Sequence, residues 1–208
     1  MRRNPAVSGS EIQLTVDAAL QDIVASSLRR GAERLKAKSG VAVAVDPKTG
    51  DVLALASYPS FDPSNLYGVS PEQFLNRAVV APYEPGSTFK LVPAAVALTD
   101  GILSPASVLH CENGAYVFDP GTRGAFRVRD HHRYGALSFR EAFAKSSNIA
   151  FAKIGRRIDR RLEEMAHDFG FGAPTGLTAG GESGGRVNPY EGWSGRTNAT
   201  MAYGYEVM

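Results

Sequence analysis

Three features of the sequence predict an α+β fold in which the early strands form an antiparallel sheet. Strand and hairpin patterns occupy roughly the first sixty residues, and helical patterns dominate from Ser87 onward. The two early strands are joined by only four residues, and the composition of this link favours a tight hairpin turn. The 208 residues, 43% hydrophobic and 21% charged, have the composition of a soluble globular protein that can bury a core without a disulfide or metal.

A strand followed by a long helix is predicted at the start of the chain. Apolar and polar residues alternate over 11–17, which predicts a half-buried strand. Asp17 is a good N-cap for a helix that extends to about Lys38, because apolar residues recur at helical spacing after it. We expect Gly40 to end this helix in a left-handed conformation.

A hairpin follows, with strands over 41–46 and 51–57 that flank the sequence PKTG at 47–50. Proline early and glycine late in this link favour a tight turn. The apolar runs on both strands are nearly continuous, which predicts a sheet covered on both faces.

The rest of the chain is predicted to be loops and helices. Residues 58–83 are rich in proline, and a helix follows from near Ser87 to about Thr99. Pro93 lies inside this helix, so we expect either a kink or a start later than Ser87. The later predicted segments are a loop or irregular strand region at 110–135, a capping box at 138–141, helices at 139–145, 148–157 and 160–168, and a glycine-rich loop at 170–185.

Composition and charge exclude several functional classes. Lys and Arg total 23 against 21 Asp and Glu, and the signs are interspersed, so we expect no nucleic-acid groove and no polybasic membrane surface. Cys111 is the only cysteine and cannot form an internal disulfide or a cysteine zinc site. Asp130, His131 and His132 are adjacent but lack further spaced ligands, so we expect neither a metal nor a cofactor.

The sharpest chemical feature is the sequence EPGSTFK at 84–90. Ser87 and Lys90 are three residues apart, so on a helix they share one face. A lysine that burial makes neutral can accept the serine proton, and the N–H groups at a helix start can stabilise an oxyanion. The alternative is a serine cap followed by a surface lysine, because Ser-x-x-Lys also occurs by chance.

A second candidate is KSSN at 145–148, between two predicted helices. The Ser146 hydroxyl can relay a proton, and the Asn148 amide can both donate and accept hydrogen bonds. Taken alone, this tetrapeptide is better explained as a helix cap.

Ser-x-x-Lys followed by Ser-x-Asn is the motif order of penicillin-binding proteins and serine β-lactamases. Over nearly its whole length the chain resembles the transpeptidase domain of class B penicillin-binding proteins. The segments that carry the resemblance are 9–17 with 20–21, 46–56, 76–90 and 135–148. The resemblance implies the penicillin-binding/serine β-lactamase-like fold, a helical subdomain against an antiparallel sheet, over 11–208, with 1–10 as a linker from a preceding pedestal domain.

The resemblance also implies a peptidoglycan D,D-transpeptidase that cross-links stem peptides and is acylated by β-lactam antibiotics. Ser87 would attack the carbonyl between two terminal D-alanines, and Lys90 would take its proton. Ser146 would help to protonate the leaving D-alanine, and Asn148 would hold the substrate backbone. Other cell-wall synthesis proteins are candidate partners. The implied location is the cell envelope, at the outer face of the cytoplasmic membrane, reached through an N-terminal anchor that this sequence does not include.

The sequence departs from the family at its third motif, Lys-Thr-Gly. These residues do occur at 48–50, but they precede Ser87 and lie in the predicted hairpin turn, so turn chemistry explains them. No Lys-Thr-Gly or Lys-Ser-Gly follows Asn148, and 202–208 resembles a helix that precedes the missing C-terminal strands. We therefore expect a domain that is incomplete at its C-terminus, with poor turnover.

Three alternatives stay open at this point. A serine β-lactamase or β-lactam sensor domain shares both motifs and would be distinguished by its deacylation. An inactive fragment that lacks the Lys-Thr-Gly motif would serve as a scaffold at most. A general Ser-Lys amidase or peptidase has no support beyond Ser87 and Lys90.

Overall fold

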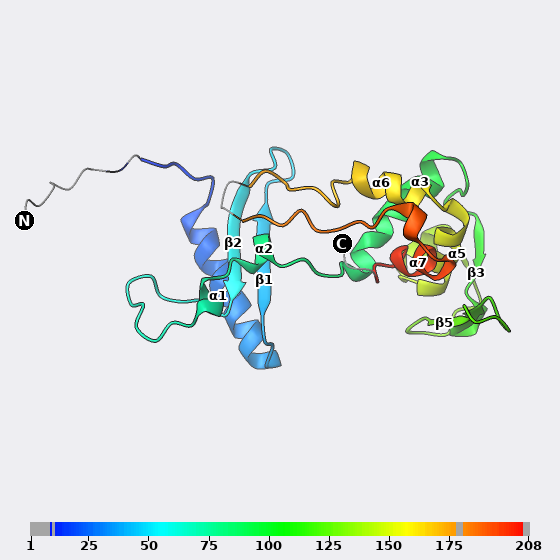
Figure 1. The fold of residues 1–208 in the computed structure, drawn as a ribbon, viewed down its shortest axis with the longest axis horizontal. Helices are drawn as coiled ribbons and strands as arrows, with labels where there is room; N and C mark the ends of the chain where they lie inside the picture. Colours follow the sequence, from blue (N-terminus) through cyan, green and yellow to red (C-terminus); the bar gives the residue numbers. More distant parts are fainter. Residues whose placement is uncertain (1–8, 10, 178–180, 206–208) are drawn as a thin grey trace, which may run out of the picture. The chain divides into compact units, whose positions relative to one another are not determined.

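The computed structural model describes residue 9, residues 11–177 and residues 181–205 (Figure 1). The chain divides into two compact units, Met1–Ala81 and Pro82–Met208. Helices and antiparallel strand pairs occur in both units, which confirms the predicted α+β class. The linker predicted at 1–10 lies outside the described residues, apart from Gly9.

The first unit consists of a long helix packed on a two-stranded antiparallel sheet (Figure 1). Its elements are α1 (Ala18–Leu35), β1 (Gly40–Val45), β2 (Val52–Tyr58), the 3₁₀ turn η1 (Pro71–Phe74) and α2 (Arg77–Val80). Gln21 ties α1 to β2, because its amide accepts the Leu55 N–H at 2.8 Å and donates to the Leu55 carbonyl at 3.0 Å. Gly50 has φ +80° in the β1–β2 turn, which confirms the predicted hairpin and the turn interpretation of 48–50.

The predicted strand at 11–17 does not form. The Asp17 N–H donates to the Leu53 carbonyl at 2.9 Å, but the described residues show no further ladder bond for this segment. Ile12 is 80% exposed and Leu14 is 71% exposed. The alternation alone was misleading, because a strand also needs a partner along its length to satisfy its backbone groups.

The prediction for α1 was right at its start and wrong at its end. Asp17 is the N-cap and accepts the Leu20 N–H at 2.8 Å. The helix ends at Leu35, and Lys36, not Gly40, takes the left-handed conformation, with φ +52°. Gly40 instead opens β1, because the chain has already turned out of the helix four residues earlier.

The prediction that both faces of the hairpin are covered is also wrong for the described residues. Val41, Val43 and Val45 of β1 are 39%, 49% and 49% exposed, and the residues between them are half-buried. Helix α1 packs on the sheet and the short α2 also contacts both strands, but these three valines stay exposed.

The second unit is mainly helical and carries two small antiparallel strand pairs (Figure 1). Its elements are η2 (Gly86–Lys90), α3 (Leu91–Thr99), β3 (Val108–His110), η3 (Glu112–Gly114), β4 (Ala115–Phe118), β5 (Phe126–Arg129), β6 (Ala136–Ser138), α4 (Phe139–Ala144), α5 (Asn148–Ile158), α6 (Arg161–Asp168), η4 (Tyr190–Gly192) and α7 (Gly195–Met201). Helix α5 packs against α3, α6 and α7 around a core that includes Phe89, Phe151 and Leu162. This core fixes the start of α5, where the second motif lies.

Most predictions for the second unit are confirmed. Helices α4, α5 and α6 lie at the predicted places, and Ser138 and Glu141 form the predicted capping box. Helix α3 starts at Leu91, which is later than Ser87. A later start was one of the two outcomes expected from the position of Pro93; the other was a kink. Pro93 lies in the first turn, where its missing N–H removes no helical hydrogen bond.

Two predictions for this unit need correction. The region at 110–135 was expected to be a loop or irregular strand, but it contains a regular hairpin, β4–β5, whose short strands carry little periodic signal. The helix expected over 202–208 lies earlier, as α7, and ends at Met201; residues 206–208 are outside the described residues. In the described parts of the chain, no helix has the length and apolar character needed to cross a membrane.

Candidate active site

Ser87 and Lys90 lie in one turn of 3₁₀ helix, η2, that leads directly into α3. Ser87 is exposed, whereas the Lys90 side chain extends into the core and is only 2% exposed. Gly86 has φ +60°, a conformation in which glycine avoids strain, and its N–H donates to the Gly204 carbonyl at 3.1 Å. A Cβ at Gly204 would lie 2.6 Å from the Gly86 Cα, so this close contact fixes the backbone just before Ser87.

Ser146 lies in the short link between α4 and α5. Its φ of +55° is rare for a residue with a Cβ and costs on the order of 1 kcal/mol. The Ser146 N–H donates to the Phe143 carbonyl, and Ser147 caps α5 by accepting the Ala150 N–H at 3.1 Å. The link therefore places Ser146 and Asn148, the first residue of α5, on either side of a buried cap.

The structure brings all four predicted site residues together around the Lys90 amine. Lys90 Nζ lies 3.1 Å from Ser87 Oγ, 2.8 Å from Ser146 Oγ and 2.8 Å from Asn148 Oδ1. It also donates to the Ser146 backbone carbonyl at 2.7 Å. Ser146 Oγ is in turn 2.9 Å from Ser87 Oγ. The two hydroxyls and the amine therefore form a closed triangle of proton donors and acceptors.

Burial sets the charge of Lys90. The loss of hydration lowers the pKa of Lys90 to about 8, against a smaller opposite effect of the Asp130 carboxylate. The Phe151 ring, 5.6 Å from Nζ, is a further part of this apolar surrounding. An amine with such a pKa exchanges a proton near neutral pH, and here it can do so with either hydroxyl.

Asp130 also lies at the candidate site, although the sequence predicts no role for it there. Its carboxylate accepts the Ser147 hydroxyl at 2.7 Å and the Ile149 N–H at 3.0 Å, so it holds both sides of Asn148. The sequence offered no clear signal for this role, because the strand that ends at Arg129 just before Asp130 was not predicted. Among the described residues no group of three or more His, Cys, Asp or Glu side chains could hold a metal ion.

Asn148 connects the site to the β4–β5 hairpin. Its amide nitrogen donates to the Arg129 carbonyl of β5 at 3.0 Å, while its oxygen faces Lys90. The Asn148 side chain thus has a fixed orientation, with each end bonded to a different element.

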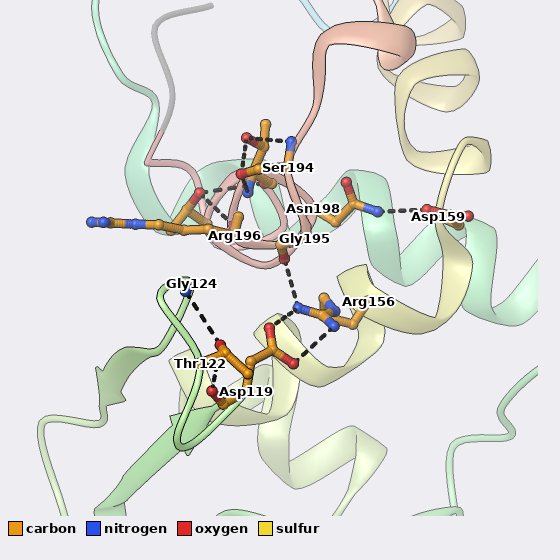
Figure 2. Close-up of polar contacts among 11 residues, drawn as sticks. Asp119, Thr122, Gly124, Arg156, Asp159, Ser194, Gly195, Arg196 and Asn198 are labelled. Carbon is orange, nitrogen blue, oxygen red and sulfur yellow. Dashed lines mark hydrogen bonds and ion pairs between the residues drawn. The ribbon is translucent and has the colours of Figure 1, made fainter.

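A separate polar cluster fixes that hairpin on the helices (Figure 2). Arg156 of α5 donates to the Asp119 carboxylate at 2.8 and 3.3 Å and to the Gly195 carbonyl at 3.0 Å. Asn198 of α7 donates to Asp159 at 2.5 Å. Asp119 directly follows β4, so the bonds of Arg156 to Asp119 and to Gly195 hold the hairpin against α5 and α7.

Cys111 is a buried thiol, as expected for a structural cysteine. Burial raises the pKa of Cys111, and its sulfur lies 3.4 Å from the Ser147 hydroxyl oxygen. A thiol that is buried and protonated is a poor nucleophile, so Ser87 is the better candidate in this unit.

Comparisons with known proteins find one family over most of the chain. Residues 40–208 match the family described as "Penicillin binding protein transpeptidase domain". The chain is 34% identical over 206 residues to penicillin-binding protein PbpB of Mycolicibacterium smegmatis, which covers 97% of this chain and 31% of that protein. It is 34% identical over 198 residues to peptidoglycan D,D-transpeptidase FtsI of Escherichia coli K12, covering 95% of this chain and 32% of FtsI.

Solved structures are also similar. The apo transpeptidase domain of Burkholderia pseudomallei penicillin-binding protein 3 has a TM-score of 0.80 and 28% identity, over 97% of this chain and 55% of that one. A peptidoglycan glycosyltransferase from Burkholderia ambifaria has a TM-score of 0.81 and 30% identity, over 94% of this chain and 56% of that one. The chain spans about a third of the length of the curated relatives it matches.

Proposed function

This chain belongs to the family of penicillin-binding protein transpeptidase domains, and from this premise we propose that it carries the acyl-transfer site of a peptidoglycan D,D-transpeptidase with Ser87 as nucleophile. The observation that carries the proposal is the position of the Lys90 amine. It is buried, its pKa is lowered to about 8, and it lies within hydrogen-bond distance of both serine hydroxyls.

In the proposed acylation, Ser87 Oγ attacks the carbonyl carbon between the two terminal D-alanines of a stem peptide. The neutral Lys90 amine accepts the Ser87 proton as the new C–O bond forms. When the C–N bond breaks, Ser146 donates its proton to the departing D-alanine nitrogen and is reprotonated by Lys90. The products are free D-alanine and an ester between the peptide and Ser87.

In the second half-reaction an amine of a neighbouring stem peptide attacks the ester. The same groups act in reverse: the attacking amine loses its proton through Ser146 to Lys90, and Lys90 returns a proton to Ser87 Oγ as the ester bond breaks. Asn148, which is held between Lys90 and Arg129, has the donor and acceptor groups to bond a peptide backbone. The result is a peptide cross-link.

The named relatives act in cell-wall synthesis, and this supports a location in the cell envelope. We extend the proposal to the outer face of the cytoplasmic membrane, where uncross-linked peptidoglycan is available. β-Lactams are the expected inhibitors, and other proteins of cell-wall synthesis are the expected partners.

The proposal is tested by the mass of the intact chain after incubation with a fluorescent penicillin. We expect one adduct per chain, and no adduct for Ser87→Ala, which should melt at the same temperature as the parent. An adduct that persists for hours supports a transpeptidase, because the ester is then resolved slowly by water. An adduct lost within seconds would instead indicate a β-lactamase, and a folded chain with no adduct would overturn the assignment of Ser87.

Asp130→Asn should slow adduct formation about tenfold. The Ser147 hydroxyl and the Ile149 N–H bond different oxygens of Asp130, and asparagine would present an NH2 group to one of them, so the turn that presents Ser146 and Asn148 loosens. Loss of the negative charge should also lower the pKa of Lys90 further, since Asp130 raises it. The check is the pH profile of adduct formation, whose midpoint should move to lower pH. A slower reaction with an unmoved midpoint would contradict the electrostatic role.

A further inference from the structure

A polar cavity of about 430 Å³ lies beside Asn148 in the second unit. Three arginines line it, Arg127 and Arg129 from β5 and Arg196 from α7, together with Glu84. We call it the arginine pocket. Asn148 belongs both to this pocket and to the hydrogen-bond network of Lys90, so the pocket adjoins the proposed acylation site.

Strand β5 and helix α7 position the three arginines. Arg127 and Arg129 are two residues apart on β5, so they share one face, while Val128 between them is buried. Arg196 lies in the first turn of α7, and Figure 2 shows its side chain extending away from Asn198 and Asp159. The contacts of Arg156 with Asp119 and Gly195 hold the hairpin and α7 in place.

The charges of the arginine pocket are not neutralised within the described residues. Arg127, Arg129 and Arg196 have no side-chain hydrogen bond or ion pair there, whereas Arg156 nearby is bonded to Asp119. Arg196 instead makes a cation–π contact, with its guanidinium 5.8 Å from the centroid of the Phe126 ring. Glu84 is the one carboxylate among the described residues that line the pocket, so these residues leave an excess of positive charge. Like charges held close together repel, and an anion between them would remove that repulsion.

We propose that the arginine pocket binds a carboxylate of the acyl-donor peptide and thereby selects donors that carry a negative charge near the reacting carbonyl. Guanidinium groups match carboxylates in a planar, two-bond geometry, which explains why three arginines are present in place of lysines. The peptide attached to Ser87 passes Asn148, and Asn148 lines the pocket, so a side-chain carboxylate of that peptide is within reach. The inference rests on the proposed function, because Ser87 defines where the donor lies.

The test uses two penicillins that differ only at the end of the acyl side chain, where one has a carboxylate and the other the isosteric carboxamide. The measured quantity is the ratio of their rate constants for adduct formation at Ser87. For the parent chain we expect the carboxylate to react about ten times faster at low salt, and the ratio to fall as salt is added. In Arg127→Gln and Arg196→Gln the ratio should approach one.

Arg123→Gln is the matched control, because Arg123 lies in the exposed turn of the same hairpin and does not line the pocket. It should keep the ratio of the parent chain, and all variants should show parent-like circular dichroism. A ratio near one in the parent chain, or one that both pocket variants retain, would overturn the inference while leaving Ser87 as nucleophile.

Calorimetry with an unreactive pair, an N-acetylated dipeptide bearing a side-chain carboxylate and its carboxamide, separates the two proposals. If neither penicillin forms an adduct, the proposed function fails, but tighter binding of the carboxylate peptide that Arg127→Gln abolishes would still support an anion site. Equal binding of the two peptides by the parent chain would count against the pocket itself.

Discussion

Replacing Lys90 with methionine should slow formation of the penicillin adduct at Ser87 by about a thousandfold or more. Lys90 Nζ is 3.1 Å from Ser87 Oγ and is the group placed to accept its proton. Methionine has a similar length and no charge, so it fits the buried site without the desolvation that an ammonium group suffers. The measurement is the time course of adduct formation by intact mass.

The same lysine should control how the reaction depends on pH. Only the neutral amine can act as a base, and burial lowers its pKa to about 8, so roughly one tenth of the chains are active at about pH 7. The rate of adduct formation should therefore rise with pH, reach half its maximum near pH 8 and level off above it. A rate that falls with pH over this range would mean that the ammonium form is the reactive one.

Lys153→Met is the matched control for Lys90→Met. Lys153 is also a lysine of the second unit, but it bonds Glu112 and the His110 carbonyl, away from the serine hydroxyls. It should keep the parent rate and pH profile. If Lys90→Met retains the reaction while Ser87→Ala loses it, another group must be the base.

Gly155→Ala should lower the free energy of unfolding of the second unit by about 3 kcal/mol. Gly155 lies where α5 crosses α7, and an added Cβ would overlap the Asn198 carbonyl oxygen and lie 2.5 Å from the Ala202 Cβ. Both neighbours belong to the packed end of the chain and cannot rotate aside, so the helices must separate. The melting temperature should fall by roughly 10 °C.

Trp193 is the only tryptophan and packs against the core of the second unit, so its fluorescence reports the unfolding of this unit. Gly192→Ala is the control, because a Cβ there would meet no described atom within 4 Å. It should melt within a degree or two of the parent chain. Equal melting temperatures for the two variants would show that the α5–α7 contact is not as tight as described.

Local signals explain which elements the sequence predicted correctly. The N-cap at Asp17, the capping box at Ser138 and the turn at 47–50 depend on residues a few positions apart, and all three are present. The same reasoning failed for 11–17 and for the outer face of β1, because exposure there depends on which segments pack against them. A periodic pattern does not contain that information.

The sequence by itself determined which four residues are the site candidates and their order along the chain, since Ser-x-x-Lys and Ser-x-Asn are short motifs with fixed spacing. Only the tertiary structure decided the chemistry around them. The Lys90 bonds to Ser146 and Asn148 join residues 56 and 58 positions apart, and burial of the amine comes from the packing of α3 and α5. Asp130 and the arginine pocket likewise arise from contacts between distant segments. The physical reason is that desolvation and long-range hydrogen bonds depend on the folded surroundings of a group, whereas caps and turns depend on its neighbours in the chain.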